Sequence, residues 1–399
     1  MNDKTLLVFP DGTSCPFFSQ FEFILRDLDF KNYVTINIVF WHTNNFNEDT
    51  KKQVIDNLLN LRMMHPEIKT FVFQNTHETI QFQTYSVVSD VVKTLVEKHN
   101  FKISDFMLVS AGSPVKYNIE SFKRAAKENN WTQIKIMFSN VYEKMFFIHN
   151  DLDNEFYKNL NSEIKDKEKV FLFLNGSSRY HRNVLVSEFF QSGLDKKSYM
   201  SAHNFNSMDS QYMSSIPGPF QNHFNFLLNN PGLLPIKLAD VEVINDISWR
   251  IWSNEIEHYE NSYVDLITET KFIRADVSKT IPWISHDTCM LDSYFVTEKT
   301  MKAFAGKMPF IIASIPLFLD ALRELGYKTF HPYIDETYDT IEDHDLRLAA
   351  IIKEIYRLAS FSKEQWREWS EKVHPIAMHN YNHFKNYKPK ILIYDPDPI

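Results

Sequence analysis

The sequence predicts an α/β protein made of two lobes, each built on a parallel sheet, with a cleft between the lobes. Three observations predict this class. Short runs of β-branched and aromatic residues alternate with helical patterns before residue 150, a polar segment follows, and the same alternation then restarts. Parallel strands need a long crossover between them, usually a helix, so this alternation favours parallel sheets covered on both faces.

The first lobe is predicted from a series of apolar runs, at residues 5–9, 33–41, 70–74, 105–112 and 134–139. Each has the composition and length of a buried strand. Valine and leucine residues at helical spacing predict helices at residues 50–64 and 85–98, between successive strands. These elements predict a Rossmann-like lobe over residues 1–155.

The segment 151–169, "DLDNEFYKNLNSEIKDKEK", is polar and charged. Two interpretations of it are equally weighted. It is either the junction between the two lobes or a surface helix of mixed charge.

The second lobe is predicted over residues 156–399. "KVFLFLNGSSRYHRNVLVSEFFQSG" indicates a strand, a turn at 175–178 and a helix that Gly193 ends. Residues 201–230 are predicted to be irregular. Further strands are expected at 262–270 and at 293–296, and the latter runs into a helix that starts at Thr297. Pro316 indicates another helix start, Gly326 its end before a strand, and residues 343–360 and 362–386 are expected to be terminal helices.

Composition narrows the class of protein. The formal net charge is −8, whereas proteins that track a nucleic-acid backbone usually carry a basic surplus. Cys15 and Cys289 are the only cysteines, which excludes a disulfide framework and a zinc cluster and favours a reducing compartment. No charged leader precedes an apolar core at the N-terminus, and no apolar run approaches the roughly 18 residues of a membrane span. A soluble, cytoplasmic protein is therefore expected.

The dipeptide Glu298–Lys299 follows Thr297 at a predicted helix start. Thr297 is a good N-cap, and Glu298 interacts favourably with the helix dipole. Lys299 does not, because a cation near a helix N-terminus is unfavourable. Its position is explained if it faces a multiply charged anion such as a pyrophosphate, and the alternative is a solvent-exposed lysine.

A second group of basic residues lies in "NGSSRYHR", just after a strand. Arg179, His181 and Arg182 surround the start of the next helix, and arginine offers a fork that matches phosphate oxygens. The alternative is that these arginines pair with acidic neighbours on the surface. Glu269 ends the strand in "LITETKF" and is predicted to bind ribose hydroxyls or an exocyclic amine, or else to cap the next turn.

The order of these motifs resembles the donor-binding half of GT-B glycosyltransferases. It is most similar to the α-1,3-fucosyltransferase type, in which a "FEN" strand end precedes a "TEK" helix start. The sequence pattern "FVTEKT…K.FAGKMPFII…P.FL..LRELGYKTF" is also similar to glycosyltransferases encoded by bacteriophages and large viruses. The resemblance covers residues 169–342. The chain departs from the fucosyltransferase pattern by an insertion, residues 271–295, between "ITET" and "VTEK".

This resemblance implies a GT-B-like enzyme that transfers a sugar, with inversion, from a nucleoside diphosphate sugar to a hydroxyl acceptor. The acceptor is a glycan, a lipid-linked molecule or another alcohol. Glu298 is then expected to bind the ribose hydroxyls and Lys299 the pyrophosphate, together with Arg179 or Arg182. The terminal helices are expected to cross back onto the first lobe. A virus-encoded enzyme of this type would act in the host cytoplasm.

The general base is expected from the first lobe, which would bind the acceptor. The candidates are Asp11, in the loop after the first strand, and Glu78, which follows another strand. Turn formation alone also explains "PDGT" around Asp11. No cofactor is required, because basic side chains stabilise the leaving diphosphate; Mg²⁺ is compatible with the site but is not predicted.

Two alternatives stay open. One is a glycosyltransferase that acts on modified bases of viral DNA, with nucleic acid as a less favoured partner. The other is a non-catalytic nucleotide- or sugar-binding protein with the same fold.

Overall fold

The structure is a computed structural model that describes residues 5–8, 33–38, 48–75, 82–110, 112–139, 146–147, 150–176, 178–202, 218–236, 256–274, 294–386, 388 and 391–396. The fold is α/β, and its sheets are mainly parallel. The chain divides into two compact units. Unit 1 comprises Met1–Met145, His286–Phe295 and Pro389–Ile399, and unit 2 comprises Phe146–Ser285 and Val296–Lys388.

Unit 1 contains a six-stranded sheet in the order β1-β2-β3-β4-β5-β10. The first five strands are parallel, and β10 joins the edge of the sheet antiparallel to β5. Their bounds are β1 Thr5–Val8, β2 Tyr33–Ile38, β3 Thr70–Asn75, β4 Phe106–Ser110, β5 Lys135–Ser139 and β10 Ile391–Tyr394. The predicted strands are therefore present, and the last strand of the chain pairs with unit 1 rather than with the preceding helices.

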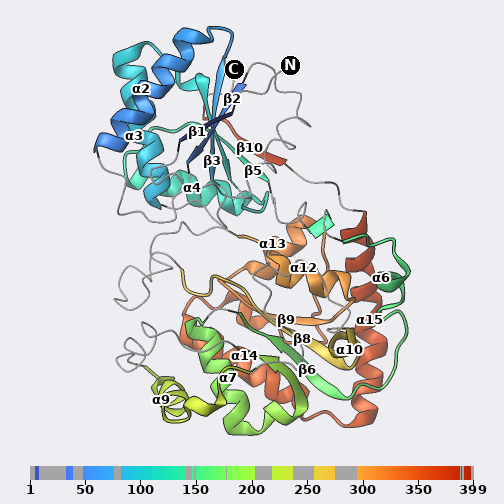
Figure 1. Ribbon diagram of the computed structural model, residues 1–399. Helices are drawn as coiled ribbons and strands as arrows, with labels where there is room; N and C mark the ends of the chain where they lie inside the picture. The colour runs from blue at the N-terminus through green and yellow to red at the C-terminus, as the bar shows by residue number, and fades with distance from the viewer. Residues whose placement is uncertain are drawn as a thin grey trace. The chain divides into compact units, whose positions relative to one another are not determined.

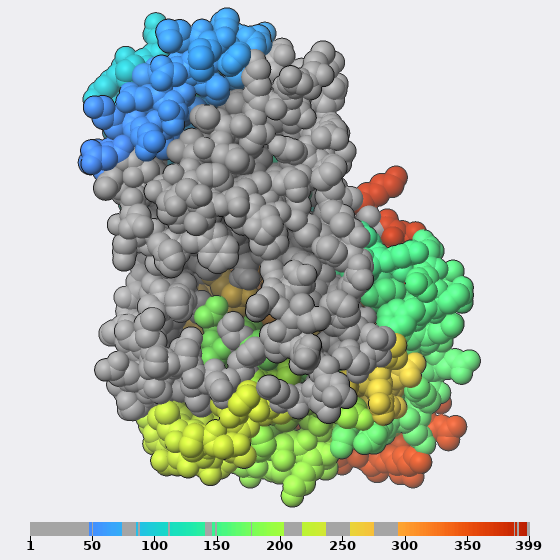
Figure 2. Space-filling model, viewed as in Figure 1, coloured from blue at the N-terminus to red at the C-terminus, as the bar shows by residue number. Residues whose placement is uncertain are grey.

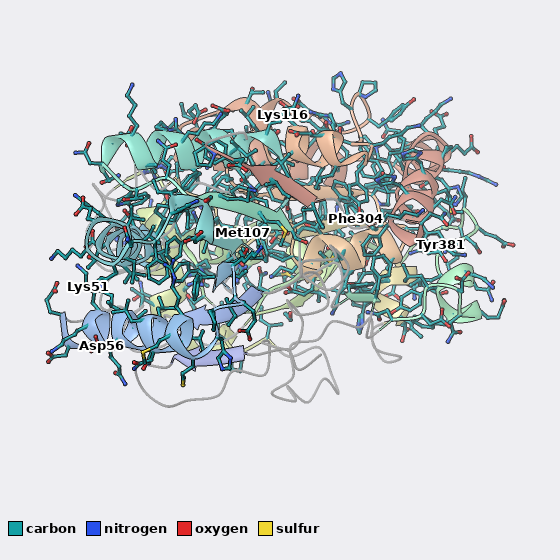
Figure 3. All side chains as sticks on the ribbon, turned by 90° about the horizontal axis from the view of Figure 1, so that it is seen from above. Lys51, Asp56, Met107, Lys116, Phe304 and Tyr381 are labelled. Carbon is teal, nitrogen blue, oxygen red and sulfur yellow. The ribbon has the colours of Figure 1, made fainter. Side chains whose placement is uncertain are left out.

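Among the described residues of unit 1, the helices are α2 (Glu48–Met64), α3 (Phe82–His99) and α4 (Lys116–Glu128) (Figure 1). They form because apolar residues recur at helical spacing, and these residues pack with the aromatic residues of β3 and β4 in one core. Met107 of β4 is buried, whereas Asp56 of α2 is exposed (Figure 3). The five parallel strands follow one another in chain order, so no reversal of strand order occurs among them.

Unit 2 contains a four-stranded parallel sheet in the order β7-β6-β8-β9. From β6 (Lys169–Leu174) the chain passes through α7 (Tyr180–Ser192) to β7 (Ser198–Ser201) on one side. It returns to β8 (Ser262–Thr268) on the other side of β6 and continues through α12 (Glu298–Ala305) to β9 (Phe310–Ala313). The strand order thus reverses between β6 and β8, and α7 and α12 lie on opposite faces of the sheet (Figure 1). In open α/β sheets, such a reversal opens a crevice at the carboxyl ends of the two strands.

The remaining elements of unit 2 surround this sheet (Figure 1). The helices α14 and α15 match the predicted terminal helices, because Asp343 and Ser362 cap their first turns. Phe224 and Leu227 of α9 are buried, and other side chains of α9 form surface in Figure 2 (yellow-green). The bounds are α6 Glu155–Asn159, α9 Gln221–Asn229, α10 Ile256–Glu260, α13 Phe318–Leu325, α14 His344–Ala359 and α15 Lys363–Lys385.

Three local predictions were wrong. Residues 294–297 form no strand, because the backbone of Tyr294 bonds to the Asn118 amide and to the Ser113 N–H instead of a sheet neighbour. Residues 327–330 form no strand either, because Lys328 exchanges both of its backbone bonds with the side chain of Asn380 on α15. The region 201–230 is not irregular throughout, since α9 lies within it.

Segment 151–169 contains α6 and belongs to unit 2.

No helix in the described ranges is long and apolar enough to cross a membrane.

Asp265 is a buried carboxyl group in the middle of β8. Burial raises its pKa to about 8, although Lys302 of α12 acts in the opposite direction. A carboxyl group whose pKa is raised by folding favours the folded state at low pH, and this contribution is lost as the pH rises to the folded-state pKa.

We therefore expect Asp265→Asn to gain stability relative to the wild type as the pH rises from about 4 to about 8, by up to about 1.4 kcal/mol per pH unit. Above pH 8 the difference should level off. Urea unfolding of both proteins at several pH values measures it. A difference that stays constant from pH 5 to 8 would show that Asp265 does not titrate in this range.

Candidate functional site

The strand reversal in unit 2 brings Asn175 and Glu269 together. Asn175 directly follows β6, Glu269 directly follows β8, and both are buried. The hydroxyl of Thr268 donates to Oδ1 of Asn175 at 2.7 Å and so joins the two strand ends. The candidate site is therefore built at the carboxyl edge of the sheet, at the point where topology predicts a ligand.

The first turn of α7 is fixed to the end of β8 by two buried side chains. Nε2 of His181 lies 3.0 Å from the backbone oxygen of Glu269, and the imidazole stacks on Phe272 with 4.7 Å between ring centroids. Burial lowers the pKa of His181, and the charge of Arg182 lowers it further. The neutral ring must donate from Nε2, since a carbonyl oxygen only accepts. Nη2 of Arg182 donates to the backbone oxygen of Thr268 at 2.9 Å. Both side chains thus hold the two elements together.

Arg179 differs from these neighbours. It is the N-cap residue of α7, in an extended conformation, and its side chain makes no cap hydrogen bond. Its Nε is buried without a hydrogen-bond partner, and no ion pair or side-chain hydrogen bond joins Arg179 to the described part of the chain. Nδ2 of Asn175 is likewise buried and has no partner there. Nε of Arg182 is buried without a hydrogen-bond partner among the described residues as well, although Nη2 of the same side chain donates to Thr268. Three side-chain nitrogen atoms in the described chain thus have donors to spare beside the first turn of α7, where the backbone N–H groups also lack helical partners.

The start of α12 is organised by Glu269. Its carboxylate accepts from the hydroxyl of Thr297 at 2.8 Å, from the hydroxyl of Thr300 at 2.6 Å and from the backbone N–H of Thr297 at 3.4 Å. Burial raises the pKa of Glu269, although the nearby ammonium of Lys299 opposes this effect. Thr297 in turn caps α12, because its Oγ1 accepts from the backbone N–H of Lys299 at 3.3 Å. Glu269 therefore supports the helix start.

Glu298 and Lys299 form an ion pair on the first turn of α12. Nζ of Lys299 lies 2.8 Å from Oε1 of Glu298 and 3.3 Å from Oγ1 of Thr297. Both side chains are partly exposed, at 19% and 23% for Glu298 and Lys299. Burial acts to raise the pKa of Glu298, but the charge and the hydrogen bond of Lys299, the backbone N–H of Glu298 and the charge of Lys302 together outweigh it, so the pKa lies below its usual value. The pair presents one acceptor group and one cation side by side at a helix N-terminus.

One buried arginine on α14 was not singled out in the sequence analysis. It holds the segments that follow β8 and β9. Arg347 is 1% exposed. It donates to the backbone oxygens of Ser314 at 3.1 Å, Ile341 at 2.6 Å, Glu342 at 3.0 Å and also Phe272, over whose ring it lies. The sequence does indicate that Arg347 is buried, because it lies on the apolar face of its helix with Leu348, Ile351 and Ile355.

Of the predicted site residues, the structure thus brings together Arg179, Arg182 and Glu269 at the strand reversal, and Thr297, Glu298 and Lys299 at the helix start that Glu269 supports. Asp11 and Glu78, the candidate general bases, lie outside the described residues, as do both cysteines. No group of three or more potential metal ligands occurs within the described ranges. No model of a known protein family matches the chain, and no curated protein matches it either.

The support that Glu269 gives to α12 predicts a stability effect. We expect Glu269→Ala to lower the free energy of unfolding by roughly 1–3 kcal/mol, because buried donors of Thr297 and Thr300 lose their acceptor. Glu269→Gln keeps one acceptor oxygen and should cost less. Chemical denaturation of the ligand-free proteins measures both. Wild-type stability in Glu269→Ala would instead favour the prediction that Glu269 only binds ligand.

Proposed function

We propose that the protein is a GT-B-like glycosyltransferase whose unit 2 binds a nucleoside diphosphate sugar at the strand reversal between β6 and β8. The observation that carries the proposal is that two buried donors at this reversal, Nε of Arg179 and Nδ2 of Asn175, have no hydrogen-bond partner among the described residues. Buried N–H groups without partners are rare in proteins, and a ligand rich in acceptor oxygens would satisfy them.

A diphosphate suits this edge of the sheet. The first turn of α7 offers backbone N–H groups and a partial positive charge. Arg179 adds a guanidinium group that no described carboxylate neutralises, while Arg182 and His181 keep the turn in place. A bound diphosphate would accept from Arg179 in the bidentate manner that arginine favours.

The start of α12 supplies the second half of the proposed site. Following the resemblance to the "TEK" motif, Glu298 would accept from the ribose hydroxyls and Lys299 would contact the diphosphate. The present ion pair between them, at 2.8 Å, keeps both side chains at the helix start. On binding, each side chain would replace part of this contact with a contact to the ligand. Because the ion pair already holds both side chains at the helix start, the site would be formed before the nucleotide binds.

In the proposed reaction an acceptor hydroxyl attacks the anomeric carbon, and the bond from that carbon to the diphosphate oxygen breaks. Negative charge develops on the leaving nucleoside diphosphate, where Arg179 and Lys299 would stabilise it. A carboxylate would take the proton of the acceptor hydroxyl, and Asp11 and Glu78 remain the candidates that the sequence offers for it.

Incubation with a panel of nucleotide sugars tests this function. We expect release of a nucleoside diphosphate from one donor, faster when a suitable alcohol is supplied and unchanged by EDTA. Binding of a nucleotide without release from any donor would contradict transfer and would favour the non-catalytic alternative.

A further inference from the structure

A pocket lies at the end of the unit 2 sheet opposite to the candidate site. It is formed where β8 begins, at Ser262 and Tyr263, and where the chain enters β9, at Met308 and Pro309. Its other walls are residues 161–167, which follow α6, and one face of α15 (Figure 1). The pocket is open to solvent, and the empty space in and above it, open solvent included, is about 400 Å³. Since the proposed nucleotide site occupies the carboxyl ends of the same strands, this pocket is separate from it.

The surface of this pocket is mainly apolar, although polar side chains, among them the exposed Glu163 and Lys165, also line it. Val373 and Ala377 of α15 line it together with Met308 and the ring of Tyr263, all of them buried. The indole of Trp369 also lines it, while its Nε1 donates to the backbone oxygen of Tyr333 at 3.0 Å. The aromatic surfaces are held firmly, because Tyr263 stacks on Trp366 with 4.3 Å between ring centroids. A flat apolar group fits such walls.

Two lining residues, Lys307 and Asn161, use their polar atoms to build the pocket. The ammonium of Lys307 donates to the backbone oxygens of Tyr157, Lys158 and Leu160 and lies 4.2 Å from the centroid of the Tyr381 ring, labelled in Figure 3. Nδ2 of Asn161 donates to the backbone oxygens of Tyr259 and Gly306. Neither group needs a further partner, so both are part of the wall.

Three other groups remain available. Nζ of Lys167 donates to Oδ1 of Asn161 and to the backbone oxygen of Glu260, which leaves one of its three N–H bonds without a described acceptor. Nε2 of His374 and the hydroxyl oxygen of Ser262 are buried and have no hydrogen-bond partner in the described chain. Burial, assisted by Lys165, lowers the pKa of Lys167 to about 8, although Glu260 acts in the opposite direction. A negative charge bound beside Lys167 would offset the unfavourable effect of burial on its ammonium group.

We propose that this pocket binds a small molecule in which a flat apolar body carries a carboxylate. The apolar body would lie against Tyr263, Met308 and Val373, and the carboxylate would accept from Lys167 and His374. Lys167 and His374 would supply two nitrogen donors for the two oxygens of the carboxylate, and a charge-assisted hydrogen bond in a partly buried site is among the stronger polar contacts.

Naphthalene-2-carboxylate is a suitable probe, and naphthalene-2-carboxamide is its neutral control. We expect calorimetric titration to show saturable binding of the carboxylate to the wild type, and binding of the carboxamide that is at least about tenfold weaker. Lys167→Met should weaken carboxylate binding by about tenfold or more, and His374→Phe should also weaken it. Circular dichroism and thermal unfolding establish that the variants are folded.

Lys158→Met is the matched control, because Lys158 is an exposed lysine of the neighbouring α6, paired with Glu155 and outside the pocket. It should bind the probe as the wild type does. The proposal is overturned if the wild type shows no saturable binding, if the carboxamide binds equally well, or if folded Lys167→Met keeps wild-type affinity. Nucleoside diphosphates should not displace the probe, so this result is independent of the proposed transferase activity.

Discussion

Arg347→Met should lower the free energy of unfolding by roughly 3–5 kcal/mol, which is at the high end for a single substitution. The guanidinium group is buried and donates to backbone oxygens of Phe272, Ser314, Ile341 and Glu342. Methionine fills part of the volume but donates no hydrogen bond, so these carbonyl groups lose their partner. Burial lowers the pKa of Arg347 to about 10, so the group is still charged at neutral pH. Urea unfolding at pH 7 measures the loss.

Arg367→Met is the control for this prediction. Arg367 lies on α15 and is exposed, so removal of its charge should change the free energy of unfolding by less than about 0.5 kcal/mol. Equal, small effects of the two substitutions would show that the contacts of Arg347 add nothing to stability.

Arg179→Ala should weaken binding of a nucleoside diphosphate by about 1.5–3 kcal/mol, or about tenfold to a hundredfold. It should leave the stability of the free protein unchanged, because Arg179 makes no hydrogen bond or ion pair with the described residues through its side chain. Affinity is measured by calorimetric titration, and stability by urea unfolding without ligand.

Arg182→Ala should give the opposite result. Its guanidinium donates to the backbone oxygen of Thr268, so its loss should lower stability by roughly 1.5–3 kcal/mol. Affinity per folded molecule should change less than in Arg179→Ala. If Arg182→Ala abolishes binding in a stable protein while Arg179→Ala binds normally, the two roles are reversed.

The sequence predicts the repetitive part of this fold well. Helices such as α14 and α15 are recognisable because caps at Asp343 and Ser362 precede long apolar stripes. Errors occur where side chains replace a sheet neighbour. The apolar run before Thr297 resembles a strand, but Asn118, which is far away in the sequence, satisfies the backbone of Tyr294. Such long-range partners cannot be recognised from local periodicity.

In the candidate site too, the sequence identified residues but not their contacts. Residue type and position identified Arg179 and Arg182 equally, because both are arginines next to the same strand end. Only the structure separates them, since Nη2 of Arg182 donates to the backbone oxygen of Thr268, whereas the side chain of Arg179 makes no hydrogen bond to the described residues. Similarly, Glu269 was a candidate ligand by position, but its carboxylate accepts from Thr297 and Thr300. These contacts depend on the order of the strands in the sheet. A local sequence motif does not reveal that order.

The central claim is that the strand reversal of unit 2 binds a nucleoside diphosphate. A thermal-unfolding series of the wild type with UDP, GDP, CMP, ADP and dTDP, each beside its nucleoside, tests it most directly. A ligand of the folded state at about 100 times its dissociation constant adds about 2.7 kcal/mol of stability. The account predicts a saturable increase in Tm with one of the diphosphates UDP, GDP, ADP and dTDP, and none with its nucleoside. No increase with any of them, or an equal increase with the nucleoside alone, would contradict the claim.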